Sequence, residues 1–505
     1  MRTTDSIRQL YYRGLRSDCN YSCSYCPFGR KNDTADAQAD ERAWQRFVQT
    51  IDHRATPVGI FLIPYGEALI HRYYREGIAH LSTLPQVTGV GCQTNLSYPA
   101  ERWLAELGQT GAAPDKIHVW ASFHPEMTTV RRFVEQLHRL HRAGLQVCAG
   151  AVAHPDNRTL LQTLRDMLSP DIYLFINAMQ GLKRKYAEEE KHFFSRLDNL
   201  FAYDLANAPA DRDECLGRTT SAYVDWKGDL RACPRSKAVL GNLYTRTALD
   251  DTPCRRTCCD CYIAFSNLSS HPVRRMLGKG TLWRVPEKPV VSAIFFDIDG
   301  TLTGADGHVP ERYAQALVYL SKRVPLYLAT SLTEDVARRR LGHRLFRLFS
   351  GGVFADGGLL CLSGQQRECM PIPPLPDCDL EGIRITGHAV NGKIYKYSLL
   401  SPSSDDAVRT ASLLAGYPYR LHHRQRLVTL THPDACKRVG FLRLCQQLHL
   451  PTDRVLAVGN EASDREWITC TPLSCAVLSA DEALRQQVRY VLNPDRLAAF
   501  FRFIP

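Results

Sequence analysis

Three cysteines near the start of the 505-residue chain constrain what it can fold into more than any other feature. Cys19, Cys23 and Cys26 follow the spacing Cys-x3-Cys-x2-Cys, which brings three thiolates together in one short loop. Three thiolates suit three irons of a [4Fe–4S] cluster and leave the fourth iron an open position. A zinc knuckle needs a fourth ligand, and the next cysteine, Cys92, is remote. The loop therefore predicts a reactive iron–sulfur centre.

Length, charge and cysteine content narrow the setting of this centre. A chain of 505 residues is expected to form two or three domains. It shows no apolar run of signal-peptide or membrane-spanning length, so we expect a soluble cytoplasmic protein without a membrane partner. Its 18 cysteines then indicate metal binding or catalysis instead of disulfides. The net charge of +11 suits a small anionic substrate, and because the basic residues are scattered, no nucleic-acid partner is expected.

Residues 1–205 alternate short apolar runs with helical stretches. The candidate strands cover residues 59–64, 87–93, 116–122, 146–153 and 172–176. Repeated strand–helix units imply a parallel sheet, here a partial TIM-like (β/α) barrel, whose functional groups gather at the carboxyl ends of the strands. The first three candidate strands are followed by Tyr65-Gly66-Glu67, by Thr94-Asn95 and by Ser122-Phe123-His124. These polar groups are expected to converge on one mouth.

In this order, the motifs resemble the radical S-adenosylmethionine (SAM) superfamily. The loop 19–26, with Tyr25 before its last cysteine, looks like that family's cluster loop, and Gly66-Glu67 looks like the second half of its Gly-Gly-Glu motif. The resemblance implies that the open iron binds SAM, that Glu67 and nearby backbone hold its amino group, and that Asn95 and Ser122 face the ribose or the substrate. One electron, from a flavodoxin- or ferredoxin-type donor, then yields a 5′-deoxyadenosyl radical that abstracts hydrogen from a C–H bond.

A second set of cysteines lies in residues 206–270, where a hairpin is predicted around Gly228. Its members are Cys215, Cys233, Cys254, Cys258, Cys259 and Cys261. The run from Gly228 to Cys233 resembles the SPASM or twitch extension of radical SAM enzymes. This implies an auxiliary [4Fe–4S] cluster with Cys215 and Cys233 as the firmer ligands and the others chosen from the last four; a structural zinc is the alternative. Residues 271–289 are basic and rich in Pro and Gly, which predicts a linker.

The pattern changes at residue 290. A buried apolar strand runs into Asp297-Ile298-Asp299-Gly300-Thr301, so two carboxylates point the same way from a strand end, and one can attack phosphorus while the other handles protons. Further along come Thr330 after a strand, Lys437 before a helix, and the loop Gly459-Asn460-Glu461-Ala462-Ser463-Asp464. In this order they resemble the haloacid dehalogenase (HAD) phosphatase superfamily.

The second resemblance implies that residues 290–505 form a Rossmann-like domain with a small Cof-like α/β cap over 366–432. Asp297 would be the nucleophile, Asp299 the general acid and base, and Thr330 and Lys437 the phosphate ligands. Mg²⁺ would lie between Asp297, the Asp299 carbonyl and Asp464. Asn460 replaces the family's first acid in this loop, which keeps an oxygen ligand but removes one negative charge.

We therefore predict an α/β enzyme with two activities. Residues 1–205 would perform SAM-dependent C–H activation on a small polar molecule, such as a phosphorylated sugar, cyclitol or nucleotide, and residues 290–505 would hydrolyse a phosphate ester of it or of a related metabolite. Radical modification of a ribosomally made peptide is one alternative. In another, the HAD domain only binds a phosphorylated metabolite.

Overall fold

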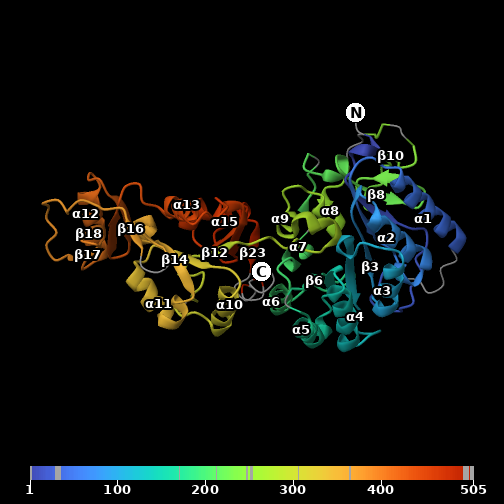
Figure 1. Cartoon of the computed structure of the whole chain (residues 1–505), viewed down its shortest axis with the longest axis horizontal. Coiled ribbons are helices and arrows are strands. Elements are labelled where there is room, and N and C mark those ends of the chain that lie inside the picture. The colour runs from blue at the N-terminus through green and yellow to red at the C-terminus, as the bar shows by residue number, and fades with distance from the viewer. Residues whose placement is uncertain are drawn as a thin grey trace. The chain divides into compact units, whose positions relative to one another are not determined.

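The computed structural model describes residues 3–28, 36–169, 171–206, 208–211, 213–245, 248–250, 254–304, 306–362, 366–492, 497 and 500. The chain is a mixed α/β protein that divides into two compact units, Met1–Glu287 and Lys288–Pro505, shown blue to green and yellow to red in Figure 1. Within the described ranges, no helix combines the length and the apolar character needed to cross a membrane.

The first unit contains a nine-stranded sheet in the order β10-β9-β8-β1-β2-β3-β4-β5-β6. Its strands are β1 (Gln9–Arg13), β2 (Val58–Leu62), β3 (Val87–Thr94), β4 (Ile117–Phe123), β5 (Gln146–Val152), β6 (Tyr173–Asn177), β8 (Ser221–Asp225), β9 (Asp229–Arg231) and β10 (Gly241–Asn242). The strands from β8 to β6 are parallel, and β9 and β10 add antiparallel edges. The five predicted strands are present as β2 to β6. In the described part of the chain, β6 and β10 end the sheet, so this pairing does not show the predicted barrel.

One face of this sheet is covered by helices that follow its strands (Figure 1). They are α1 (Ala37–Asp52), α2 (Arg72–Thr83), α3 (Ala100–Gln109), α4 (Val130–Arg142), α5 (Arg158–Met167), α6 (Glu188–Leu197) and α7 (Phe201–Leu205). Phe133 and Leu137 lie on the buried face of α4. Because alternate strand residues face the helices, this packing leaves the other residues, such as His118 and Trp120, on the second face.

The segment predicted as a linker, residues 271–289, instead packs on that second face. It forms α9 (Pro272–Leu277) and the 3-10 helix η6 (Gly278–Trp283), and α8 (Tyr262–Ser266) precedes it. Trp283 stacks on His118 at 3.9 Å and its Nε1 donates to the Ile60 carbonyl at 2.8 Å. Gly89 makes room for the indole, since a Cβ there would lie 2.7 Å from it. The linker prediction is wrong up to Glu287 because its Trp and Leu side chains complete the core.

The second unit contains an eight-stranded sheet in the order β16-β15-β14-β13-β12-β21-β22-β23. The strands are β12 (Ala293–Phe296), β13 (Leu326–Ala329), β14 (Phe349–Phe354), β15 (Leu359–Cys361), β16 (Arg367–Cys369), β21 (Val455–Gly459), β22 (Leu473–Val477) and β23 (Tyr490–Leu492). The helices are α10 (Glu311–Ser321), α11 (Glu334–Phe346), α13 (Lys437–Gln447), α14 (Arg465–Ile468) and α15 (Glu482–Gln487). Strand order reverses at β12, between parallel neighbours β13 and β21, which is where open α/β sheets bind ligands.

A small cap with its own core lies between β16 and α13. It consists of an antiparallel sheet in the order β17-β18-β20-β19 and one helix. Their bounds are β17 (Arg384–Val390), β18 (Lys393–Leu400), α12 (Ser404–Leu414), β19 (Arg420–Arg424) and β20 (Leu427–Thr431). This agrees with the expected α/β cap, except that residues 367–369 pair with β15 and so belong to the main sheet.

Candidate functional site

The cysteine loop lies at the carboxyl ends of β2, β3 and β4. Glu67 N donates to the Asp18 carbonyl at 3.0 Å, just before Cys19. Asn95, after β3, donates its amide to Cys19 Sγ at 3.6 Å. Gly66 allows this packing, because a Cβ there would lie 1.8 Å from the Asp18 carbonyl oxygen. The predicted residues Cys19, Gly66, Glu67 and Asn95 therefore do come together.

Glu67 is buried with its carboxylate already bonded by the protein. It accepts hydrogen bonds from Thr94 Oγ1 at 2.7 Å, Asn95 N at 2.5 Å and Leu69 N at 2.9 Å. A carboxylate offers about four acceptor positions, so three are used. Glu67 thus fixes the turns after β2 and β3, and has at most one position left for the predicted contact with an amino group.

Tyr25 and two residues after β4 hold the other end of the loop. Tyr25 Oη lies 3.1 Å from His124 Nδ1, and Glu126 accepts hydrogen bonds from Ser24 N and Oγ at 2.6 and 2.5 Å. Burial lowers the pKa of His124 to about 4, so this imidazole is neutral. His124 was expected at this mouth only through its place after a strand, and Glu126 was not predicted. Ser122 lies on β4 beside Gly150 of β5.

The three thiols of the loop are close enough to affect one another's ionisation. Burial, followed by the Cys26 and Cys19 charges, raises the pKa of Cys23 to about 12. Three thiolates this close require a cation to ionise together, and metal binding supplies one. No three His, Cys, Asp or Glu side chains in the described ranges are arranged to hold a metal ion. The chemistry of the donors nevertheless fits an iron–sulfur cluster.

The second set of cysteines also comes together. Burial raises the pKa of Cys233 to about 12; the Cys261 and Cys215 thiols add to this effect, and backbone hydrogen bonds from Arg235 and Ser236 oppose it. Burial, with Cys215 first and then Cys254, Cys261 and Cys258, raises the pKa of Cys259 to about 11. Strand β11 (Cys258–Cys259) is held by pairing with β7 (Ala208–Pro209). All six predicted candidates thus share one region, and the predicted hairpin before Cys233 is β8–β9.

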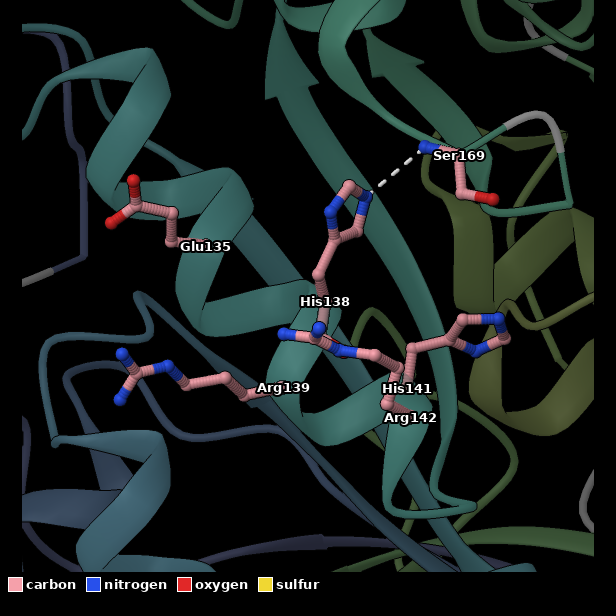
Figure 2. A pocket seen from close by; sticks show the side chains of 6 residues that line it. All are labelled: Glu135, His138, Arg139, His141, Arg142 and Ser169. Carbon is pink, nitrogen blue, oxygen red and sulfur yellow. Dashed lines mark hydrogen bonds between the residues drawn. The ribbon is translucent and has the colours of Figure 1, made fainter.

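A surface hollow of about 400 Å³ lies away from these strand ends, against the exposed side of α4 (Figure 2). It is lined by Glu135, His138, Arg139, His141, Arg142 and Ser169. His138 accepts a hydrogen bond from Ser169 N at 3.1 Å, and His141 pairs with Asp171 at 2.7 Å. Its two imidazoles are therefore engaged in holding α4 to the loop before β6.

In the second unit, Asp297, Lys437 and Asp464 form a buried ionic triad at the switch point. Lys437 Nζ donates to Asp297 Oδ1 at 2.8 Å and to Asp464 Oδ1 at 2.6 Å. Burial raises the pKa of Asp297 to about 7 despite the ammonium beside it. Burial alone lowers the pKa of Lys437, but the two carboxylates raise it overall, so Lys437 stays charged.

Asp464 is fully engaged by this arrangement. Its Oδ2 accepts from Asn460 N at 3.0 Å and Glu461 N at 3.1 Å, and Trp467 Nε1 donates to its Oδ1 at 3.0 Å beside Lys437. Burial opposes its ionisation, but Lys437 and the other donors lower the pKa of Asp464 overall. A direct bond to Mg²⁺, as predicted for Asp464, requires one of these donors to leave.

Asn460 closes a set of oxygens that fits Mg²⁺. Its amide lies 3.0 Å from the Asp299 carbonyl, 3.3 Å from Asp297 Oδ2 and 2.8 Å from Thr301 Oγ1, and donates to all three when its nitrogen faces them. With its oxygen on that side instead, the Asn460 amide adds an oxygen beside the Asp299 carbonyl and Asp297 Oδ2, and hard oxygens are the ligands that Mg²⁺ prefers. The residues therefore fit a magnesium ion once this amide has rotated to turn its oxygen toward the site.

The remaining predicted residues surround this point. Thr330 is buried after β13, and its Oγ1 accepts a hydrogen bond from Leu332 N at 3.2 Å. Asp299 is exposed and pairs with Arg340 of α11 at 3.4 Å. Thr301, Trp467 and Arg340 were not predicted, because hydrogen-bond partners of a site carry no spacing signal of their own.

Comparison with known proteins identifies the second unit. Residues 413–504 match the family described as haloacid dehalogenase-like hydrolase. A phosphoglycolate phosphatase of Methanothrix thermoacetophila is 23% identical over 207 residues, covering 40% of this chain and 91% of the relative. A haloacid dehalogenase-like hydrolase of Bacteroides thetaiotaomicron aligns with 14% identity, 43% of this chain, 100% of its own and a TM-score of 0.37. A protein of Thermotoga maritima aligns with 11% identity, 42% of this chain, 96% of its own and a TM-score of 0.37.

The C-terminal unit thus carries a HAD-like hydrolase domain, built on a Rossmann-type parallel sheet.

Proposed function

We propose that the C-terminal unit is a Mg²⁺-dependent phosphatase for small phosphate monoesters. The observation that carries this is the buried Asp297 carboxylate 2.8 Å from the Lys437 ammonium, beside Asp299. Asp297 attacks phosphorus while Asp299 gives its proton to the departing oxygen. Asp299 then takes a proton from the water that hydrolyses the aspartyl-phosphate, which releases inorganic phosphate and restores Asp297 as the carboxylate and Asp299 as the acid. Asp297, the Asp299 carbonyl and Asn460 would hold Mg²⁺, which would supply neutralising charge.

Lys396 of the cap indicates what kind of leaving group this phosphatase accepts. Its side chain is buried, and Nζ donates to the carbonyl of Ser331, next to Thr330, at 2.8 Å. Burial lowers the pKa of Lys396, opposed by Asp356. In the described ranges no carboxylate lies within ion-pair distance of it. A buried cation beside the phosphate loop favours a leaving group with a second negative charge. The similarity to a phosphoglycolate phosphatase supports this, since phosphoglycolate carries a carboxylate.

Phosphate release from a panel of substrates tests the hydrolase. Wild-type protein with Mg²⁺ is expected to hydrolyse phosphoglycolate and related phospho-acids, with Asp297→Asn as the inactive control. Activity on these substrates but not on neutral phosphate esters would identify the second charge as a requirement. If no substrate is hydrolysed above the Asp297→Asn control but phosphate esters bind, the domain is a metabolite-binding module instead.

We further propose that the N-terminal unit is a radical SAM enzyme. Its support is the placement of the Cys19 loop on the carboxyl ends of parallel strands, with Glu67 and Asn95 fixed beneath it. A bound cluster and SAM would supply the radical. The chain's own part is to hold three thiolates in one loop, to fix that loop through Tyr25 and Glu126, and to collect a second set of cysteines around Cys233.

Anaerobic reconstitution with iron and sulfide tests this proposal. The protein is expected to take up about eight irons if both sites hold four-iron clusters, and to form 5′-deoxyadenosine from SAM under reduction. Cys23→Ala should abolish SAM cleavage, while Cys92→Ala, a buried cysteine outside the loop, should not. Tightly bound zinc without SAM cleavage would overturn the proposal.

Together, the two proposed activities make a bifunctional enzyme that acts on a small phosphorylated metabolite. The peptide-modifying alternative predicts that 5′-deoxyadenosine forms with a short peptide encoded nearby, and not with phosphorylated metabolites. The buried cation at Lys396 favours the metabolite, since it gives the second unit a small anionic substrate.

A further inference from the structure

Arg284 is a buried arginine whose charge has no direct partner. It follows η6 directly, keeps 8% of its surface exposed and adopts the left-handed conformation (φ 59°), which is uncommon for a residue with a side chain. Its guanidinium carbon lies 4.0 Å from the ring centre of Trp120 and 4.1 Å from that of Tyr262. The aromatic rings take the flat faces of the guanidinium, and its N–H edge stays in the ring plane.

That edge is almost without acceptors. Nη1 donates to Asn177 Oδ1 at 3.3 Å, and Nε is buried without a hydrogen-bond partner in the part of the chain the structure describes. Asp204 favours the charge of Arg284 only from beyond ion-pair distance, and burial raises the pKa of Asp204 itself. Buried arginines are normally paired with a carboxylate, because an isolated buried charge is costly. Arg284 therefore lacks an anion.

The position of this edge connects it to the strand ends. Asn177 is the last residue of β6, at the same edge of the parallel sheet as the turns that hold the cysteine loop. Cys261 of the second cysteine set is near enough to influence the pKa of Arg284, after burial, Tyr262, Asp204 and Tyr11. An anion bound to the free N–H groups would therefore lie on the second face of the sheet, which η6 also covers, beside Asn177.

We propose that Arg284, with Asn177, binds an oxyanion of a small molecule, a carboxylate or a phosphate group. The guanidinium fork offers parallel N–H donors that match either group. The proposal that Arg284 binds an anion depends only on this geometry. The proposal that this anion belongs to the substrate of the first unit rests on the function proposed above.

Anion titration of the full-length protein tests this site without clusters or SAM. Binding of inorganic phosphate and of acetate is measured by calorimetry at constant ionic strength in a Lys437→Met background, which removes the phosphate ligand of the second unit. One anion is expected to bind, and Arg284→Met should weaken it at least tenfold. Arg274→Met is the matched control, because that arginine donates to the Ser266 carbonyl on the same segment and should leave binding unchanged. Comparing the two ions tells a phosphate site from a carboxylate site.

Thermal unfolding of the same variants distinguishes an anion-binding role of Arg284 from a structural one. Arg284→Met should unfold cooperatively, at a temperature no lower than wild type without anion, because it removes an unpaired buried charge. Its loss of cooperative unfolding would show that the guanidinium is a structural element and would overturn the proposal. Unchanged anion affinity in Arg284→Met, or no binding of either anion in the Lys437→Met background, would also overturn it. SAM cleavage enters none of these measurements, so their outcome is independent of the radical proposal.

Discussion

Asn460→Asp is the substitution that most directly probes the magnesium site. In the metal-free protein, the amide lies 3.3 Å from Asp297 Oδ2 and can donate to it. A carboxylate in its place repels Asp297 by about 5 kcal/mol at an effective dielectric constant of about 20. Protonation of Asp297, whose pKa burial raises to about 7, limits this cost to about 2.7 kcal/mol at pH 9, the pH at which affinity is compared.

Magnesium binding removes this repulsion, so the variant should bind the metal more tightly than wild type. Asn460 is partly exposed, and solvent screens part of the repulsion. Even half of this limit, about 1.4 kcal/mol, is a tenfold decrease in Kd at pH 9. Metal-free Asn460→Asp should also unfold at a lower temperature than wild type and regain the difference on addition of Mg²⁺.

Calorimetric titration of metal-free protein with Mg²⁺ measures the affinity directly, alongside thermal unfolding over a Mg²⁺ series. Glu461→Gln is the matched control, because this exposed neighbour also changes one charge but faces Arg424 at 3.8 Å instead of the metal oxygens. An affinity in Asn460→Asp equal to wild type, or weaker, would refute the view that residue 460 is a ligand of the ion.

Three further substitutions test the structure. Lys437→Met leaves Asp297 and Asp464 buried without their cation, so the unfolding free energy should fall by about 3–5 kcal/mol in denaturant titrations at pH 7, and no loss would contradict the triad. Trp283→Ala removes the indole packed on His118, with an expected cost of about 3–5 kcal/mol to the first unit; a cost below about 1 kcal/mol would mean that the segment is loosely held. Burial lowers the pKa of His118 to about 3, so the unfolded chain binds one more proton than the folded one as pH falls from about 6.5. Stability is then fully present above that pH and falls by up to about 1.4 kcal/mol per pH unit below it. His118→Gln should remove this contribution in urea titrations at pH 7, 6 and 5, and an unchanged slope would show that other groups cause it.

The sequence was a good guide where local pattern and function coincide. The strands β2 to β6 were predictable because each combines apolar runs with turn residues at its ends. Cys19, Glu67 and Asn95 were predictable as neighbours because parallel strands end at one edge. The resemblance to the HAD superfamily brought Asp297 together with Lys437 and Asp464, although Asp297 lies more than a hundred positions from both in the chain.

What escaped prediction depends on contacts that leave no local trace. Residues 271–287 look like a linker because Pro, Gly and basic residues dominate them, yet Trp283 and Leu282 pack against glycines on β2 and β3. The saturation of Glu67 and of Asp464 follows from backbone N–H groups whose positions no side-chain pattern encodes. The same holds for the amide of Asn460, whose neighbours come from another loop.

The packing of Trp283 and Arg284 also governs how the protein is made. The chain emerges from the ribosome with its amino end first, and domains generally fold in that order. Here η6 helps to cover the second face of the first sheet. This helix ends at Trp283, and the second unit begins at Lys288, so that face is completed only at the end of the first unit. A nascent chain that ends near residue 270 exposes that apolar face and is a target for chaperones. The first unit therefore completes its fold only when synthesis of the second unit begins.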